Sequence, residues 1–144
     1  GALKLIEDLR EHAHEADLAE LMDDLRAEIG QDRDDLLAAM DRLGVTPGRF
    51  KQLVAAAAES LGRLALPHLG KPEYLSRLLA LEALSAGIWT KLQLWRALAA
   101  DPQTKAAVGD GQLQRLMERG RTQLDRLEPH HAEAAERALG TPDR

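Results

Sequence analysis

Two Glu-x-x-His sequences contain the residues of this chain that are best suited to chemistry. One runs from Glu11 to His14 and the other from Glu128 to His131. On a helix, a spacing of three residues places both side chains on one face, within reach of a single metal ion. Di-metal carboxylate sites in helical bundles combine two such pairs with Glu residues from two other helices. The two pairs therefore raise the hypothesis of an iron or manganese centre.

Carboxylates elsewhere in the chain could complete such a site. Glu82 lies in an apolar segment, and Glu28 and Asp32 are four residues apart and share a helical face. However, Pro129 lies inside the second pair and disturbs the helical geometry that the spacing needs. Our favoured hypothesis is therefore a protein without a metal or other cofactor. The weaker hypothesis is a metal site with the candidate ligands Glu28, Asp32, Glu82, Glu128 and His131.

Other catalytic chemistry has little support in the sequence. The chain has no cysteine, which excludes thiolate metal sites and cysteine nucleophiles. No Ser-His-Asp arrangement, Gly-rich phosphate loop or Walker motif is apparent. We therefore expect a protein that is not an enzyme.

Composition predicts one helical domain that covers residues 1–144. Ala, Leu, Arg, Asp and Glu dominate, and β-branched and aromatic residues are few, which favours helices over strands. No signal peptide is recognisable, and the uncharged stretches are far shorter than the roughly 20 apolar residues that a membrane span needs. We expect a cytoplasmic protein that does not bind membranes.

Helical periodicity and helix-ending residues define the expected elements. Asp17, with Glu20 three residues later, predicts a capping box, and Gly44 predicts a helix end. Pro129 predicts a kink or a break in the last helix. The expected helices cover about residues 3–14, 18–43, 47–66, 74–99 and 112–139. Long helices with short links predict an antiparallel four-helix bundle, to which the first helix is a short addition.

The segment 74–99 is apolar around nearly its whole circumference, which predicts a buried central helix that carries the single carboxylate Glu82. A buried carboxylate needs a partner or must be protonated. Arg33 and Arg63 are the candidate partners, and Arg33 is favoured because it interrupts the apolar stripe of its own helix. We therefore predict a structural core network of Glu82, Arg33 and Asp32.

Charge is unevenly distributed along the chain. Residues 1–44 hold five Lys or Arg against thirteen Asp or Glu, and residues 45–100 hold seven against three. These regions could pack on each other or on a second copy, so a homodimer or another protein partner is expected. A nucleic-acid partner is not, because no basic stripe is interleaved with aromatics. Trp89 and Trp95 are expected in the core, with a pocket for a small apolar ligand as an alternative.

Short sequence matches resemble a family of small, uncharacterised bacterial proteins from high-GC organisms. The matching residues are Glu28, Asp32-Arg33, Leu36, Met40 to Pro47, Lys51, Glu59, Gly62-Arg63-Leu64, Leu75-Ser76-Arg77-Leu78, Leu81-Glu82-Ala83-Leu84, Gly87, Lys91 and Leu94-Trp95-Arg96. The resemblance implies a ferritin-like helical bundle with no assigned activity. The first helix here looks shorter than in that family, which weakens the expectation of a metal site. Together these points favour a non-enzymatic bundle that acts through self-association or a protein partner, with a di-metal carboxylate protein or an apolar-ligand carrier as alternatives.

Overall fold

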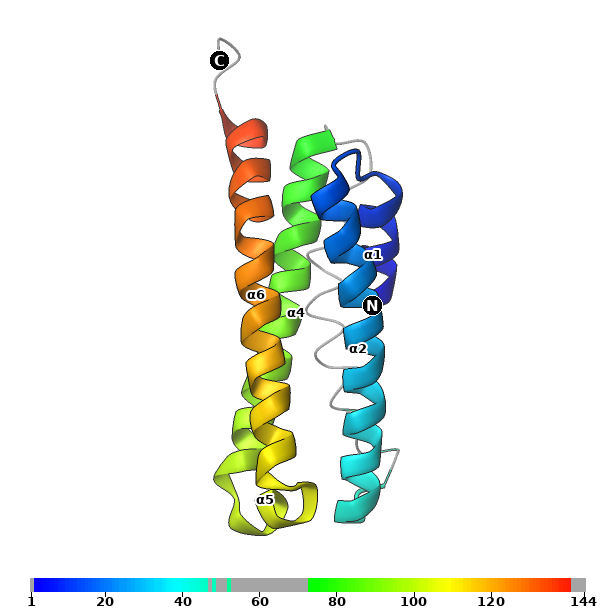
Figure 1. Cartoon of the computed structure of the whole chain (residues 1–144), viewed down its shortest axis with the longest axis vertical. Coiled ribbons are helices and arrows are strands. Elements are labelled where there is room, and N and C mark those ends of the chain that lie inside the picture. Colours follow the sequence, from blue (N-terminus) through cyan, green and yellow to red (C-terminus); the bar gives the residue numbers. More distant parts are fainter. Residues whose placement is uncertain (1, 47, 49–51, 53–72, 141–144) are drawn as a thin grey trace.

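The computed structural model describes residues 2–46, 48, 52 and 73–140, and this part of the chain is all-helical, with no strand. Its helices are α1 (Ala2–Glu11), α2 (Ala16–Leu43), α4 (Glu73–Ala100), α5 (Pro102–Val108) and α6 (Asp110–Leu139). The three long helices α2, α4 and α6 lie side by side, and α1 covers one end of α2 (Figure 1). The all-helical fold is confirmed. The expected helix over residues 47–66 falls outside the described residues.

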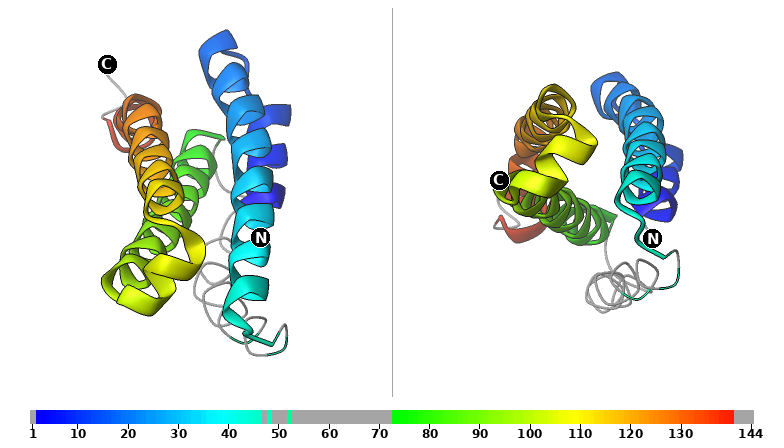
Figure 2. Two further views of the ribbon diagram at one scale, coloured as in Figure 1. Left: turned by 60° about the horizontal axis from the view of Figure 1, so that its bottom comes forward. Right: turned by 90° about the horizontal axis from the view of Figure 1, so that it is seen from below.

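Contacts between the long helices fix their directions. Glu15, just before α2, pairs with Arg77 of α4, and Asp32 of α2 pairs with Lys91 of α4. The pairs follow the same order along both helices, so α2 and α4 run parallel. Glu82 of α4 contacts His131 of α6, whereas Leu92 lies beside Gly120, so α4 and α6 run antiparallel. Seen from below, the three helices surround a common interior (Figure 2).

Helix ends show where the local predictions succeeded and failed. Gly44 ends α2 with a φ of 67°, in the left-handed region that glycine adopts without strain, as expected. The capping box was wrong: the N-cap of α2 is Glu15, whereas Asp17 lies in the first helical turn. Glu15 makes no side-chain cap hydrogen bond, and its carboxylate instead binds an arginine of α4.

The link between α4 and α6 is more ordered than its sequence indicated. Asp101 ends α4 and caps the short helix α5, because its Oδ2 accepts hydrogen bonds from the backbone N of Thr104 at 2.9 Å and from its hydroxyl at 2.7 Å. These bonds hold the pKa of Asp101 below its usual value. Gly109 then turns the chain with a φ of 99°, and α6 begins at once at Asp110. The last helix therefore begins two residues before the expected start at about residue 112.

Helix α6 continues through Pro129 without a break. Proline removes the hydrogen bond that residue 129 would donate to the carbonyl of Asp125. Both residues are exposed, so water can replace that bond. The helix therefore has no break between Glu128 and His131, the second Glu-x-x-His pair.

Within the described residues, the core consists of two apolar clusters stacked along the bundle. The first joins α1, α2, α4 and α6 around Leu25, Leu81 and Leu127, and the second joins α2, α4, α5 and α6 around Trp95, Val108 and Leu113. On α4 the first cluster ends at Ile88 and the second begins at Leu92. Burial of these side chains is the main source of stability. The boundary between the clusters is where polar side chains enter the interior.

Candidate functional site

A layer of polar side chains separates the two apolar clusters. Its buried centre is Asp32 of α2, which is 3% exposed and pairs with the ammonium group of Lys91 from α4. The second carboxylate oxygen, Oδ1, accepts a hydrogen bond from Nη1 of Arg119 on α6 at 2.7 Å. One carboxylate therefore joins the three long helices. We call Glu28, Asp32, Lys91, Arg119 and Gln123 the polar layer.

Gln123 completes the polar layer by bridging its remaining members. Its side chain is 1% exposed. Its Oε1 accepts from Lys91 Nζ at 2.9 Å, and its Nε2 donates to Glu28 Oε2 at 3.0 Å. The layer thus balances two carboxylates with two cations through one amide. Buried charges need such complete pairing, since an unpaired buried charge is strongly destabilising.

Of the three residues in the predicted core network, Asp32 is buried, whereas Glu82 and Arg33 are exposed. Glu82 is exposed: half of its side chain meets solvent, and its Oε1 lies 3.3 Å from Nε2 of His131. Arg33 is exposed as well. Because a helix turns by about 100° per residue, Arg33 points away from the interior that its neighbour Asp32 enters. The proposed pair of Glu82 with Arg33 is therefore not formed.

The candidate metal ligands do not come together in one site. Glu28 and Asp32 belong to the polar layer, Glu82 and His131 contact each other further along α4 and α6, and Glu128 is exposed. No group of three or more His, Asp or Glu side chains in the described residues is arranged to hold a metal ion. The first Glu-x-x-His pair is also divided, since Glu11 ends α1 and His14 lies beyond it.

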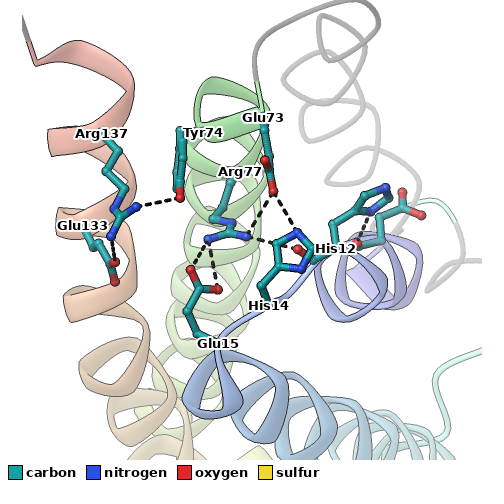
Figure 3. A network of polar contacts seen from close by, with 9 residues as sticks. His12, His14, Glu15, Glu73, Tyr74, Arg77, Glu133 and Arg137 are labelled. Atoms are coloured by element: carbon teal, nitrogen blue, oxygen red, sulfur yellow. Dashed lines mark hydrogen bonds and ion pairs between the residues drawn. The ribbon is translucent and has the colours of Figure 1, made fainter. Parts of the chain in front are cut away.

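A second polar cluster joins the α1–α2 link to α4 and α6 at one end of the bundle (Figure 3). Its centre is Arg77, which is 8% exposed and donates from Nη1 to both carboxylate oxygens of Glu15 at 3.0 and 3.2 Å. Nη2 of Arg77 donates to the carbonyl of His12 at 3.1 Å. A guanidinium group suits this role because its donors form a rigid fork. Arg77 thus fixes the chain between α1 and α2.

Tyr74 extends this cluster to α6. The guanidinium carbons of Arg77 and Arg137 lie 5.3 and 5.0 Å from its ring centroid, and Arg137 donates to its hydroxyl at 2.7 Å. Two cations on one ring favour a fixed arrangement of helix ends. Nearby, the hydrogen bond from the backbone N–H of Glu15 and the Arg77 guanidinium hold the pKa of the Glu15 carboxyl below its usual value, although desolvation raises it.

The two tryptophans have opposite environments. Trp95 is fully buried in the second apolar cluster, and its Nε1 has no hydrogen-bond partner in the part of the chain described. Trp89 is 57% exposed. The expectation of a core position was thus right for Trp95 and wrong for Trp89. At about 100° per residue, the two side chains point about 120° apart around the helix, so they do not line one shared site.

A shallow surface hollow of about 270 Å³ lies elsewhere, between α1 and α2. Charged side chains that pair with each other form much of its wall, including Arg10 with Asp23 and Arg26 with Glu7. Ligand pockets are usually concave and mostly apolar. This hollow is not of that kind, and it is not at the tryptophans.

Sequence reasoning missed Lys91, Arg119 and Gln123 as members of the polar layer. One signal was available in α6: Gln123 falls in the series Leu116, Gly120, Leu127 at spacings of three and four, where an apolar residue is expected. A polar residue at such a position needs a polar partner on a facing helix. Lys91 and Arg119 carried no comparable signal, because long cationic side chains are common at helix edges.

Comparisons with known proteins add no family to this description: no protein-family model, curated protein or solved structure matches the chain. The resemblance noted from the sequence stays a prediction. Within residues 2–46 and 73–140, no helix is long and apolar enough to cross a membrane.

Proposed function

We propose that this chain is a non-enzymatic helical-bundle protein that acts through association with another protein chain, either a second copy or a different partner. The observation that carries the proposal is the exposure of Trp89 in the middle of α4. The chain contains only two Trp, one Tyr and one Phe, and Trp89 nevertheless leaves 57% of its surface in solvent. Tryptophan is among the residues that most often form the energetic centre of protein interfaces.

The buried polar groups support a structural role for the interior. Both oxygens of Asp32 and both amide atoms of Gln123 are occupied by side chains of the same protein. Catalytic sites need groups that are free to meet a substrate. The polar layer has the opposite character, and it fixes the register of three helices instead.

The same proposal includes an antiparallel four-helix bundle, as the sequence predicts. Support comes from the directions of the described helices: α2 and α4 run parallel, and α6 runs antiparallel to both. Parallel direction is what diagonal helices have in an up-down-up-down bundle. The outer face of α4 then belongs to a rigid support, which suits an interaction surface.

Light scattering tests the self-association form of the proposal. We expect the mass of the parent to rise above that of one chain as concentration increases from about 1 to 100 µM, the range in which micromolar affinities act. Trp89→Ala should require at least tenfold more protein for the same mass, since removing a central tryptophan typically costs about 2 kcal/mol or more. Leu37→Ala on α2 is the control, because Leu37 is also exposed. A parent that stays at the mass of one chain throughout contradicts self-association.

A further inference from the structure

The outer face of α4 has a charge order that is complementary to itself. Glu82, Trp89 and Arg96 are all exposed and are spaced by seven residues, so they form one stripe along the helix. The stripe has a carboxylate at one end, an aromatic ring at its centre and a guanidinium at the other end. The two charged residues each lie about 10 Å from the centre, at 1.5 Å per residue.

We infer that this stripe binds a second copy of the same chain, with the two α4 helices antiparallel and a two-fold axis at Trp89. This inference rests on the proposed function and names its partner. A two-fold axis exchanges identical surfaces. With the axis at Trp89, a residue that lies a given number of positions before Trp89 therefore meets the partner's residue that lies the same number of positions after it. Here the axis places Glu82 opposite the partner's Arg96, Arg96 opposite the partner's Glu82, and the two Trp89 rings against each other.

Helix α6 repeats the same order of charges beside the stripe. Glu82 contacts His131, and Leu92 lies beside Gly120, which fixes the level of α6 against α4. Glu128 of α6 therefore lies toward the Glu82 end, and Arg121 lies toward the Arg96 end. Both are exposed and share one face of α6, because they are seven residues apart. The acidic end and the basic end thus extend over two helices, which strengthens the complementarity between copies.

The surface around Trp89 allows another helix to approach. Ser85 and Ala86, one turn before Trp89, are small and half-buried. Small residues next to a large one permit the close packing of two helices. A parallel arrangement of copies would instead place Glu82 against Glu82 and Arg96 against Arg96. Like charges in contact are unfavourable, so the antiparallel arrangement is selected.

Charge reversal tests this arrangement in the full chain. Glu82→Arg and Arg96→Glu each create two like-charged contacts per dimer, so each variant alone should dimerise about tenfold more weakly than the parent in sedimentation equilibrium. In an equal mixture of the two variants, every contact is again between opposite charges. The mixture should therefore regain the parental affinity as a heterodimer. The controls Glu20→Arg and Arg33→Glu make the same charge changes at exposed positions of α2.

The outcomes separate this inference from the proposed function. Weak single variants with a restored mixture support the arrangement. A parent that dimerises with unchanged affinity in both reversal variants overturns it and leaves self-association standing through another surface. A parent that is a monomer at every concentration overturns both the arrangement and the self-association on which it rests.

Discussion

Replacing Asp32 with alanine is expected to lower the free energy of unfolding by about 3–5 kcal/mol. The substitution leaves two cations near the centre of the bundle without their shared carboxylate, of which Lys91 is 17% exposed and Arg119 is 31% exposed. Arg119 can turn partly to solvent or toward Asp35, whose Oδ2 is 3.9 Å away. Among the described residues, Lys91 then keeps only the amide oxygen of Gln123. Most of the loss is therefore assigned to the stranded ammonium group of Lys91.

Urea unfolding followed by circular dichroism measures this loss. Asp34→Ala is the matched control, since Asp34 lies on the same helix and is exposed. Its effect should stay within about 0.5 kcal/mol. Asp32→Asn keeps the size of the side chain but removes its charge, and it should lie between the parent and Asp32→Ala. Equal stability of the Asp32→Ala and Asp34→Ala proteins would show that the polar layer does not hold the helices together.

Arg77→Ala should lower the free energy of unfolding by about 2 kcal/mol at neutral pH. The substitution removes donors from the Glu15 carboxylate and from the carbonyl of His12, and it removes a cation from the face of Tyr74. The expected value is below that for Asp32 because Glu15 is 37% exposed, so water replaces part of what is lost. Arg77→Lys keeps the charge without the two-pronged fork and should recover less than half of the loss.

The pH dependence of Arg77→Ala has a defined sign. Because the folded state holds the pKa of Glu15 below its ordinary value of 4.5, this carboxylate stabilises the protein above that pH, and the contribution disappears as pH falls through the lower folded value. The difference in stability between the parent and Arg77→Ala should therefore be constant from pH 7 to about 5 and shrink below 4.5. Denaturant titrations at pH 7 and pH 3.5 test this prediction. If the difference in stability between the parent and Arg77→Ala is the same at both pH values, Glu15 is not the partner through which Arg77 stabilises the protein.

The sequence predicted the long helices α2, α4 and α6 well because their apolar spacing is strong, and Gly44 marked the end of α2. The short helix α5 was not predicted. The sequence also failed at Glu15, because a cap without a side-chain cap bond has no local signature; its carboxylate is fixed by Arg77, 62 residues away. It also placed Glu82 and Trp89 inside. Counting apolar residues around a helix does not show which of its faces the other helices leave uncovered.

The polar layer shows the same limit. Asp32 interrupts an apolar stripe, so its burial could be inferred from α2 alone. Its partners could not, because the choice among cations depends on how α4 and α6 slide along α2. Lys91 and Arg119 reach Asp32 only because the helices have this register.

Disulfide cross-linking between two single-cysteine variants tests the antiparallel contact of α4 helices most directly, since the parent chain has no cysteine. A two-fold axis at Trp89 places residue 85 of one copy opposite residue 93 of the other. Residue 85 of one copy lies about 12 Å along the helix axis from residue 85 of the other copy, and the same holds for residue 93. This is beyond the roughly 7 Å that a disulfide spans between Cα atoms. A mixture of Ser85→Cys and Gln93→Cys should therefore form a covalent heterodimer under mild oxidation, whereas each variant alone should not. Equal cross-linking of the separate variants and the mixture, or none in any sample, would contradict the arrangement.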